Sequence, residues 1–207
     1  GKLDAQDDAI LAKSVRTIVD QVDAMKRLVN EFRDYARLPS AELKPVQLNA
    51  LISDVMVLYA NEPADRIVRA KVITELDPAC PAILGDEQQL RQVIHNLLQN
   101  AQDASEAQAH VMLVTRWSPA RKRVKMTVLD EGSGFSPSIL QRAFEPYVTT
   151  KAKGTGLGLA VVKKIADEHG AKIEMGNILQ NDVIHGAQVS LSFEAMQAAV
   201  GLEKSST

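Results

Sequence analysis

The sequence predicts an α+β chain in two parts, one long helix followed by a domain that mixes helices and strands. Residues 4–38 contain neither glycine nor proline, and their apolar residues recur at alternating spacings of four and three, as in a helix of a bundle or coiled coil. Farther along, segments with helical spacing alternate with segments typical of strands. Pro39 and Ser40 separate the two patterns, so we place the domain boundary there.

The long helix carries an apolar seam that keeps a heptad pattern over nearly four heptads. A lone helix cannot bury such a seam, so we expect the helix to need a partner. The domains that we expect are 1–40 for the helical part, 41–195 for the α/β domain and 196–207 for a frayed or helical tail. The seam consists of Leu11, Val15, Ile18, Val22, Met25, Val29, Phe32 and Ala36.

The first half of the α/β domain is predicted to hold two helices and three short strands. Helical spacing of apolar residues predicts helices over 48–59 and 86–104, and a turn is expected at 61–65. Asp86 and Gln89 have the spacing of a capping pair at the start of the second helix. The strands are expected at 46–48, 67–76 and 81–84.

The helix over 86–104 has two distinct faces. Asn96, Asn100 and Asp103 stand at i, i+4 and i+7 and share one polar face. Asparagine is a middling helix former and is destabilising when buried without a partner. This face is therefore either a solvated surface or a row of oxygens directed at a metal–phosphate group. The other face is an apolar stripe of Leu90, Val93, Ile94, Leu97, Leu98 and Ala101.

Two strands are expected next, over 110–117 and 123–130. Asp130 continues the apolar face of the second strand, because strand side chains alternate between the two faces. An acid in that place is desolvated and needs a hydrogen-bond donor. Ser136 is better placed than Asp130 to cap the helix that follows. The residues that share this face are Val124, Met126, Val128 and Asp130.

Two glycine clusters follow the second strand. The first contains Gly132 and Gly134, and the second, GTGLGL at 154–159, opens a helix expected over 157–169. Glycine lets the backbone approach a ligand closely, and a helix N-terminus attracts phosphate. Neither cluster fits the P-loop or the Rossmann fingerprint. Alone, the pattern fits a phosphate site or a flexible loop with an ordinary helix cap.

The polar segment 145–155 lies between a short helix expected over 136–144 and the second cluster. We expect it to be a mobile lid over the phosphates. Thr149, Thr150 and Lys151 are candidates to contact the phosphate chain. The lysines of this segment can equally be ordinary solvent-exposed charges. Gly170 is expected to close the next helix, and the last strands are expected at 172–175 and 187–193.

Together these elements resemble the Bergerat-type ATP-binding fold of gyrase, the Hsp90 chaperones, MutL and sensor histidine kinases. The resemblance covers about residues 80–193 and implies a two-layer α/β sandwich with a mixed sheet, preceded by the long helix. It implies that ATP and Mg²⁺ are bound. The matching motifs, in order, are NLLQNAQDA for the Asn-containing helix, DEGSGF for the first glycine box, FEPYVTTK for the Phe-containing box and GTGLGL for the second glycine box.

The resemblance implies roles for particular residues. Asp130 would read the adenine amino group, Asn100 would hold magnesium, and Gly156 and Gly158 would free backbone N–H groups for phosphate. The full set of ATP-binding residues that we expect is Asn96, Asn100, Asp103, Asp130, Gly132, Gly134, Tyr147, Thr150, Lys151, Gly154, Thr155, Gly156, Leu157, Gly158 and Leu159.

Asn96 separates the kinases from the hydrolases within this resemblance. Gyrase-type ATPases carry a glutamate at the matching place, and an amide cannot act as a general base. The chain is most similar to sensor histidine kinases of the NtrY (nitrogen-regulation) type, through LVNEFRDYARLP at 28–39 and the stretch 144–170. The alternatives are a Bergerat-fold ATPase, and a nucleotide-binding interaction module without transfer activity.

The kinase resemblance implies partners for the chain. Residues 1–40 would be the second helix of a dimerisation and phosphotransfer hairpin, the whole protein would be a homodimer, and a response-regulator receiver domain would accept the phosphoryl group. None of the four histidines is followed by an acid or lies on the long helix, so the phosphoacceptor motif H-[ED]-x-x-N-P is not found. We therefore expect a fragment that cannot phosphorylate itself, and His95 is expected to serve packing or solvent contact.

The composition excludes several classes of protein. The net charge of −2 and the aromatic content of 4% argue against a nucleic-acid-binding surface. The single cysteine, Cys80, excludes an internal disulfide and a Cys-based zinc site and is expected near the core. No apolar run approaches the roughly 18 residues of a membrane span. We expect a cytoplasmic fragment, with the full-length protein held in the bacterial inner membrane by upstream segments.

Overall fold

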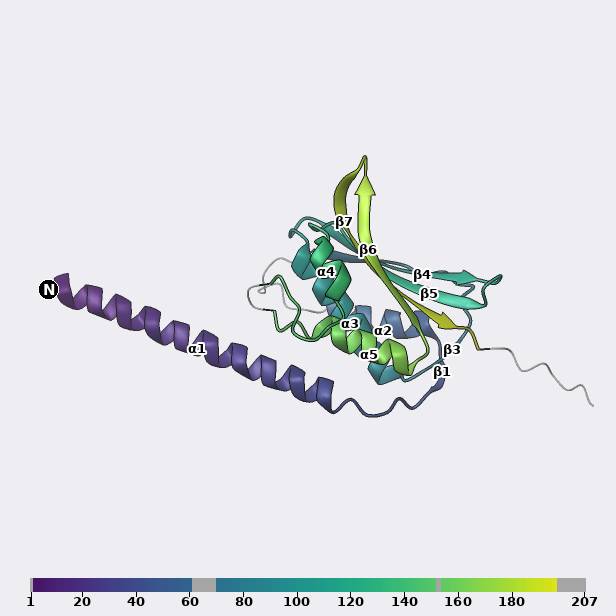
Figure 1. Ribbon diagram of the computed structural model, residues 1–207, viewed down its shortest axis with the longest axis horizontal. Helices are drawn as coiled ribbons and strands as arrows, with labels where there is room; N and C mark the ends of the chain where they lie inside the picture. The colour runs from purple at the N-terminus through teal and green to yellow at the C-terminus, as the bar shows by residue number, and fades with distance from the viewer. Residues whose placement is uncertain (1, 61–69, 152–153, 197–207) are drawn as a thin grey trace, which may run out of the picture.

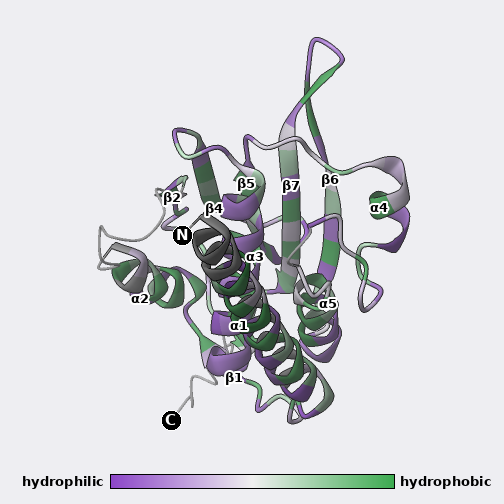
Figure 2. Cartoon of the chain, turned by 90° about the vertical axis from the view of Figure 1, so that its left-hand side faces the viewer, coloured by the Kyte–Doolittle hydropathy of each residue, from purple (hydrophilic) through white to green (hydrophobic). Residues whose placement is uncertain are grey.

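A computed structural model of the chain describes residues 2–60, 70–151 and 154–196. The long helix α1 (Lys2–Ala36) precedes an α/β domain in which helices cover one face of a mixed sheet, as Figure 1 and Figure 2 show. The predicted α+β fold, a two-layer domain preceded by one long helix, is confirmed.

Within the described residues, the main sheet has five strands in the order β2-β4-β5-β7-β6. The edge strand β2 is parallel to β4, and the remaining neighbours are antiparallel, so the sheet is mixed. A separate antiparallel pair joins β1 (Lys44–Val46) and β3 (Ile83–Gly85). The strands of the main sheet are β2 (Lys71–Glu75), β4 (His110–Ser118), β5 (Arg123–Asp130), β6 (Lys172–Gln180) and β7 (Val183–Glu194).

The core lies between the sheet and the helices α2 (Leu48–Ala60), α3 (Glu87–Ala104) and α5 (Gly158–Glu168). The apolar stripe expected on α3 is buried along its whole length. Each fully buried aliphatic side chain stabilises the fold by about 1.5–3 kcal/mol. The short helix α4 (Pro137–Arg142) begins after Ser136, whose hydroxyl accepts a hydrogen bond from the Ile139 N–H, as expected for the cap.

The apolar seam of α1 is exposed: the exposed fraction is 62% for Leu11 and 67% for Met25. Figure 1 shows the N-terminal end of α1 pointing away from the domain. The expectation that this seam needs a partner stays a prediction.

The end of α1 and the linker after it are tied to the domain. The Lys164 ammonium donates to the Tyr35 carbonyl at 3.2 Å and lies 5.5 Å from the centre of the Tyr35 ring. The Glu168 carboxylate accepts from the Ala41 N–H at 3.1 Å. The Gln89 amide, on the first turn of α3, donates to the Pro39 carbonyl at 2.8 Å. These contacts fix where the linker leaves the domain.

The capping pair at the start of α3 is only half formed. Asp86 caps the helix by accepting from the N–H groups of Gln88 and Gln89. The Gln89 side chain does not return this bond, because it reaches the linker instead. The Asp86 N–H is bound by the ring of His169 at 2.9 Å.

The last two strands are longer than expected, and the predictions 172–175 and 187–193 were too short. They continue into a hairpin that projects from the sheet in Figure 1. Asn181 and Asp182 have φ of 51° and 62°, as in a two-residue type I′ turn. The Asn-Asp pair between the two runs was the sequence signal for this hairpin.

Smaller differences concern the first three strands of the domain. β1 lies at 44–46 instead of 46–48, and β3 at 83–85 instead of 81–84. β2 begins at Lys71, and residues 67–69 of the strand expected there lie outside the described residues. The turn expected at 61–65 and the tail beyond Met196 also lie outside them.

Candidate functional site

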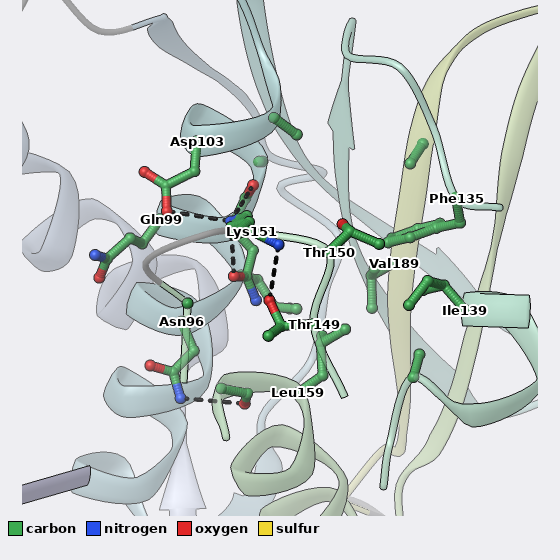
Figure 3. Close-up of a pocket in the computed structure, with 18 of the residues that line it drawn as sticks. Asn96, Gln99, Asp103, Phe135, Ile139, Thr149, Thr150, Lys151, Leu159 and Val189 are labelled. Atoms are coloured by element: carbon green, nitrogen blue, oxygen red, sulfur yellow. Dashed lines mark hydrogen bonds and ion pairs between the residues drawn. The ribbon is translucent and has the colours of Figure 1, made fainter. Parts of the chain in front are cut away.

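A cavity of about 520 Å³ lies where α3, the end of β5, the lid segment and the start of α5 meet (Figure 3). The structure therefore brings together the motifs that lie far apart in the sequence. Of the expected site residues, those that line the cavity are Asn96, Asn100, Asp103, Asp130, Gly134, Thr150, Lys151, Gly154, Thr155, Gly156, Gly158 and Leu159.

Three expected site residues do not line the cavity but support it. The Gly132 N–H donates to the Asp130 carboxylate at 2.9 Å. Leu157 is buried directly before α5. Tyr147 has a φ of 67° and a half-exposed ring, and its N–H donates to the Gly156 carbonyl at 3.0 Å. They act through the backbone positions that they fix.

Asp130 is a buried carboxylate at the end of β5, as its strand register predicted. Its Oδ1 atom accepts from the N–H groups of Gly132, at 2.9 Å, and Ala187, at 3.1 Å. Burial raises the pKa of this carboxyl, and the two backbone hydrogen bonds oppose that effect in part. Among the described residues both hydrogen bonds end on Oδ1, so Oδ2 is the oxygen left for a ligand.

The polar face of α3 points into the cavity, which decides between the two roles that the sequence left open. The Lys151 ammonium lies 3.3 Å from Asn100 Oδ1 and 3.1 Å from Asp103 Oδ2. The Asn96 amide donates to the Gly158 carbonyl at 3.4 Å, at the start of α5. Figure 3 shows Asn96 and Asp103 on the same side of the cavity as Lys151. The face therefore lines the cavity and is not simply a solvated surface.

The oxygens around Lys151 already hold one cation, so they can also suit a metal ion. Within the described part of the chain, no three side chains among His, Cys, Asp and Glu are grouped closely enough to hold a metal by themselves. Mg²⁺ is commonly held by one or two protein oxygens together with substrate phosphates. Asn100 and Asp103 fit that arrangement and do not fit a metal site made of protein alone.

The lid segment is closed at its base by a contact that only glycine allows. Gly156 has a φ of 71°, and a Cβ atom there would lie 2.6 Å from the backbone carbon of Tyr147. α5 begins two residues later, and Leu157 gives it no side-chain cap. This helix start can therefore offer N–H groups to an anion.

The sequence prediction missed the apolar end of the cavity. Figure 3 shows Phe135, Ile139 and Val189 on the side opposite to Asn96, Gln99 and Asp103. Val128 also lines this end, and its place two residues before Asp130 on the same strand face was a usable signal. Phe135 and Ile139 follow Asp130 closely in the chain, whereas Val189 comes from β7, and no local pattern connects the three. An apolar wall beside one buried acid suits a flat heterocycle with an amino group.

Cys80 and two of the histidines have structural roles. Cys80 is partly buried against the core as expected, and burial raises the pKa of its thiol. His95 is exposed, and its Nδ1 lies 2.9 Å from the Tyr59 hydroxyl, which confirms the expected solvent contact and packing. His169 is buried and joins the end of α5 to the start of α3. Neither histidine lines the cavity.

Comparison with known proteins matches residues 85–197 to the family described as histidine kinase-, DNA gyrase B-, and HSP90-like ATPase. The signal transduction histidine-protein kinase AtoS of Escherichia coli K12 is 29% identical over 171 residues, which is 83% of this chain and 28% of AtoS. The nitrogen regulation protein NtrY of Azorhizobium caulinodans is 33% identical over 202 residues, which is 94% of this chain and 25% of NtrY. The chain thus spans about a quarter of these relatives.

Among solved structures, full-length ShkA in complex with AMPPNP is similar, with a TM-score of 0.71 and 28% identity over 90% of this chain and 39% of ShkA. The helices within the described residues include none with the length and apolar character that a membrane span requires.

Proposed function

This chain belongs to the family of histidine kinase-, DNA gyrase B- and HSP90-like ATPases, and we propose that its cavity binds ATP together with Mg²⁺. The chain is the ATP-binding catalytic domain of a two-component sensor histidine kinase. The proposed reaction is therefore transfer of the γ-phosphoryl group to a histidine. A response-regulator aspartate would receive the group next. One observation carries the proposal: a single cavity has a buried acid, Asp130, beside an apolar wall at one end and side-chain oxygens with a lysine at the other end.

The apolar end of the cavity would take adenine. Asp130 Oδ2 would accept a hydrogen bond from the amino group of the base, while Oδ1 stays bound by the chain. The ring would lie against Phe135, Ile139 and Val189. A buried acceptor of this kind favours a base with an amino group over one with a carbonyl oxygen at the same place, because two acceptors cannot pair.

The polar end would take the phosphate chain. Asn100, with Asp103 beside it, would hold the metal, which when bound neutralises charge on the phosphate oxygens. Lys151 would then leave these oxygens and contact phosphate, and Thr150 and the start of α5 would add hydrogen bonds. Phosphoryl transfer depends mainly on positioning and charge neutralisation, and these contacts would provide both.

Hydrolysis of ATP is the less favoured function. Asn96, at the place where gyrase-type ATPases carry a glutamate, donates its amide to the Gly158 carbonyl and cannot take a proton from water. Tight nucleotide binding without transfer to any supplied partner would instead indicate the interaction module.

We further propose that the whole protein is of the NtrY type. The similarity to NtrY over 94% of this chain supports this subtype. The proposal includes a homodimer formed through the helical part at 1–40, an ATP-binding part at 41–195, and attachment to the bacterial inner membrane through other segments, with this part in the cytoplasm.

A calorimetric titration of the chain with a non-hydrolysable ATP analogue, with and without Mg²⁺, tests the proposed binding. We expect saturable binding that Mg²⁺ strengthens, and clearly weaker binding of the matching GTP analogue. Equal affinity for both analogues would contradict the role of Asp130, and no binding of either would contradict the proposed function.

A further inference from the structure

We infer that Asn177, in the hairpin β6–β7, is a positioning residue that holds Phe135 in place at the base end of the cavity and thereby sets the affinity for adenine. The inference rests on the proposed function, in which that end takes the base. Asn177 does not line the cavity, and it lies outside the sequence motifs that indicated the site.

The Asn177 side chain binds both backbone polar groups of one residue. Its Oδ1 accepts from the Phe135 N–H at 2.7 Å, and its Nδ2 donates to the Phe135 carbonyl at 2.9 Å. The two residues are 42 positions apart in the sequence. Two hydrogen bonds to the backbone of one residue fix both its position and its orientation, as a neighbouring strand would.

The loop that carries Phe135 is irregular and lies against the hairpin. Residues 131–136 form neither helix nor strand. Gly134 has a φ of 72°, and a Cβ atom there would lie 2.8 Å from Asn177 Oδ1 and 2.5 Å from a methyl group of Ile184. The loop therefore passes so close to the hairpin that only glycine fits, and the hairpin is the surface against which the loop is formed.

The position of Phe135 explains why the hydrogen bonds from Asn177 affect binding. Its ring forms part of the apolar wall with Ile139 and Val189, while Lys151 and the polar face of α3 lie on the opposite side (Figure 3). Release of the Asn177 hydrogen bonds would loosen the wall and leave the polar end intact. Loss of affinity should therefore depend on the base and not on the phosphates.

The test compares two ligands of the 207-residue chain by calorimetry in the presence of Mg²⁺, namely ATP and inorganic tripolyphosphate. We expect Asn177→Ala to weaken ATP binding about tenfold and to leave tripolyphosphate binding within about twofold. The control is Gln180→Ala, an exposed residue on the same strand, which should change neither. Unchanged ATP affinity in Asn177→Ala, or an equal loss for both ligands, would overturn the inference.

Asn177→Asp provides a second variant of nearly the same shape if the alanine variant fails to fold. It keeps an acceptor for the Phe135 N–H but sets a carboxylate oxygen against the Phe135 carbonyl, and two acceptors cannot pair, so we again expect a base-dependent loss. Amide hydrogen exchange of residues 131–136 adds a readout without nucleotide: exchange should become faster in both Asn177 variants, and an unchanged rate would overturn the inference. Absence of ATP binding by the unmodified chain would instead contradict the proposed function.

Discussion

At the scale of single residues, the site depends on charged side chains that other parts of the chain hold in place. Asp130 is bound through one oxygen by Gly132 and Ala187, which come from the following loop and from β7. Lys151 is held by Asn100 and Asp103 on α3. In both cases a charged group that would be destabilising without a partner has hydrogen-bond partners in the chain, and it can still bond to a ligand.

Asp130→Asn should weaken ATP binding about tenfold to a hundredfold, since a hydrogen bond to a charged group contributes about 1.5–3 kcal/mol. The amide oxygen can still accept from Gly132 and Ala187, so stability should change less than affinity. The amide nitrogen would then face the adenine amino group, and two donors cannot pair. Calorimetry and thermal unfolding measure the two effects. Glu131→Gln, the adjacent exposed acid, is the control, and unchanged affinity in Asp130→Asn would contradict the adenine assignment.

Asp130 should also make ATP binding depend on pH. Burial raises the pKa of its carboxyl above the ordinary value of about 3.9. The folded chain then holds this proton more tightly than the unfolded chain, so protonation of Asp130 stabilises the fold at low pH. This contribution to the free energy of unfolding is lost as pH rises from the pKa in the unfolded chain through the higher pKa in the folded chain. ATP binding has the opposite requirement, because adenine needs the ionised acid.

We therefore expect ATP affinity to fall on acidification at a pH above that of an ordinary aspartate. Dissociation constants measured from about pH 8 downward would show this, and in Asp130→Asn this component should disappear. The phosphates of ATP titrate equally in both proteins, so the difference between the two profiles isolates Asp130. Identical profiles would contradict the prediction.

At the scale of elements, α3 serves packing and binding at once. Its apolar stripe is buried in the core, and its polar face lines the cavity, because residues three, four and seven apart share a face. Strand β7 and the described part of the lid, at 148–151 and 154–155, line the same cavity. The cavity is therefore lined both by regular elements and by an irregular segment.

Asn100→Ala should remove the Mg²⁺ dependence of ATP binding, and Asn96→Ala should have a smaller effect. Asn100 Oδ1 already faces an ammonium at 3.3 Å, whereas the Asn96 amide faces the Gly158 carbonyl. Calorimetric titrations with and without Mg²⁺ measure the difference. Gln88→Ala, an exposed position on the first turn of α3, is the control. Persistence of the Mg²⁺ effect in Asn100→Ala would mean that the metal is held elsewhere.

The lid at 145–155 should be ordered by nucleotide. In the described part of the lid, Lys151 holds to Asn100 and Asp103, and these contacts would be replaced by contacts to phosphate. Amide hydrogen exchange of this segment should slow when the ATP analogue and Mg²⁺ are added, while the exchange of β4, a strand without residues that line the cavity, should stay the same. Equal lid exchange in both states would contradict the prediction.

At the scale of the whole molecule, the helical part and the ATP-binding domain meet at a small joint. Lys164, Glu168 and Gln89 hold the segment from Tyr35 to Ala41 through hydrogen bonds. Beyond this joint the apolar seam of α1 is exposed. An exposed apolar seam of this length favours association with another helix.

The 207-residue chain should bind ATP and yet fail to phosphorylate itself. Neither His95 nor His169 lines the cavity, and α1 carries no histidine. Radioactive ATP should therefore label this chain only after it is extended by a helix with the H-[ED]-x-x-N-P motif, and the same extension should cover the seam and produce a stable dimer. Acid-labile phosphate on the unextended chain would contradict the prediction, because one of its own histidines would then be the acceptor.

The sequence by itself determined the fold class, most of the helices and the polar end of the site. These features depend on local periodicity and on motif spacing, as in the α3 stripe, the face with Asn100 and Asp103, and the position of Asp130 on its strand. Only the tertiary structure decided the apolar wall with Phe135 and Val189, the hairpin contact of Asn177, and the return of Gln89 to the linker instead of its own helix cap. Those contacts join residues far apart in the chain, and their partners are set by the packing of whole elements, which no local pattern records.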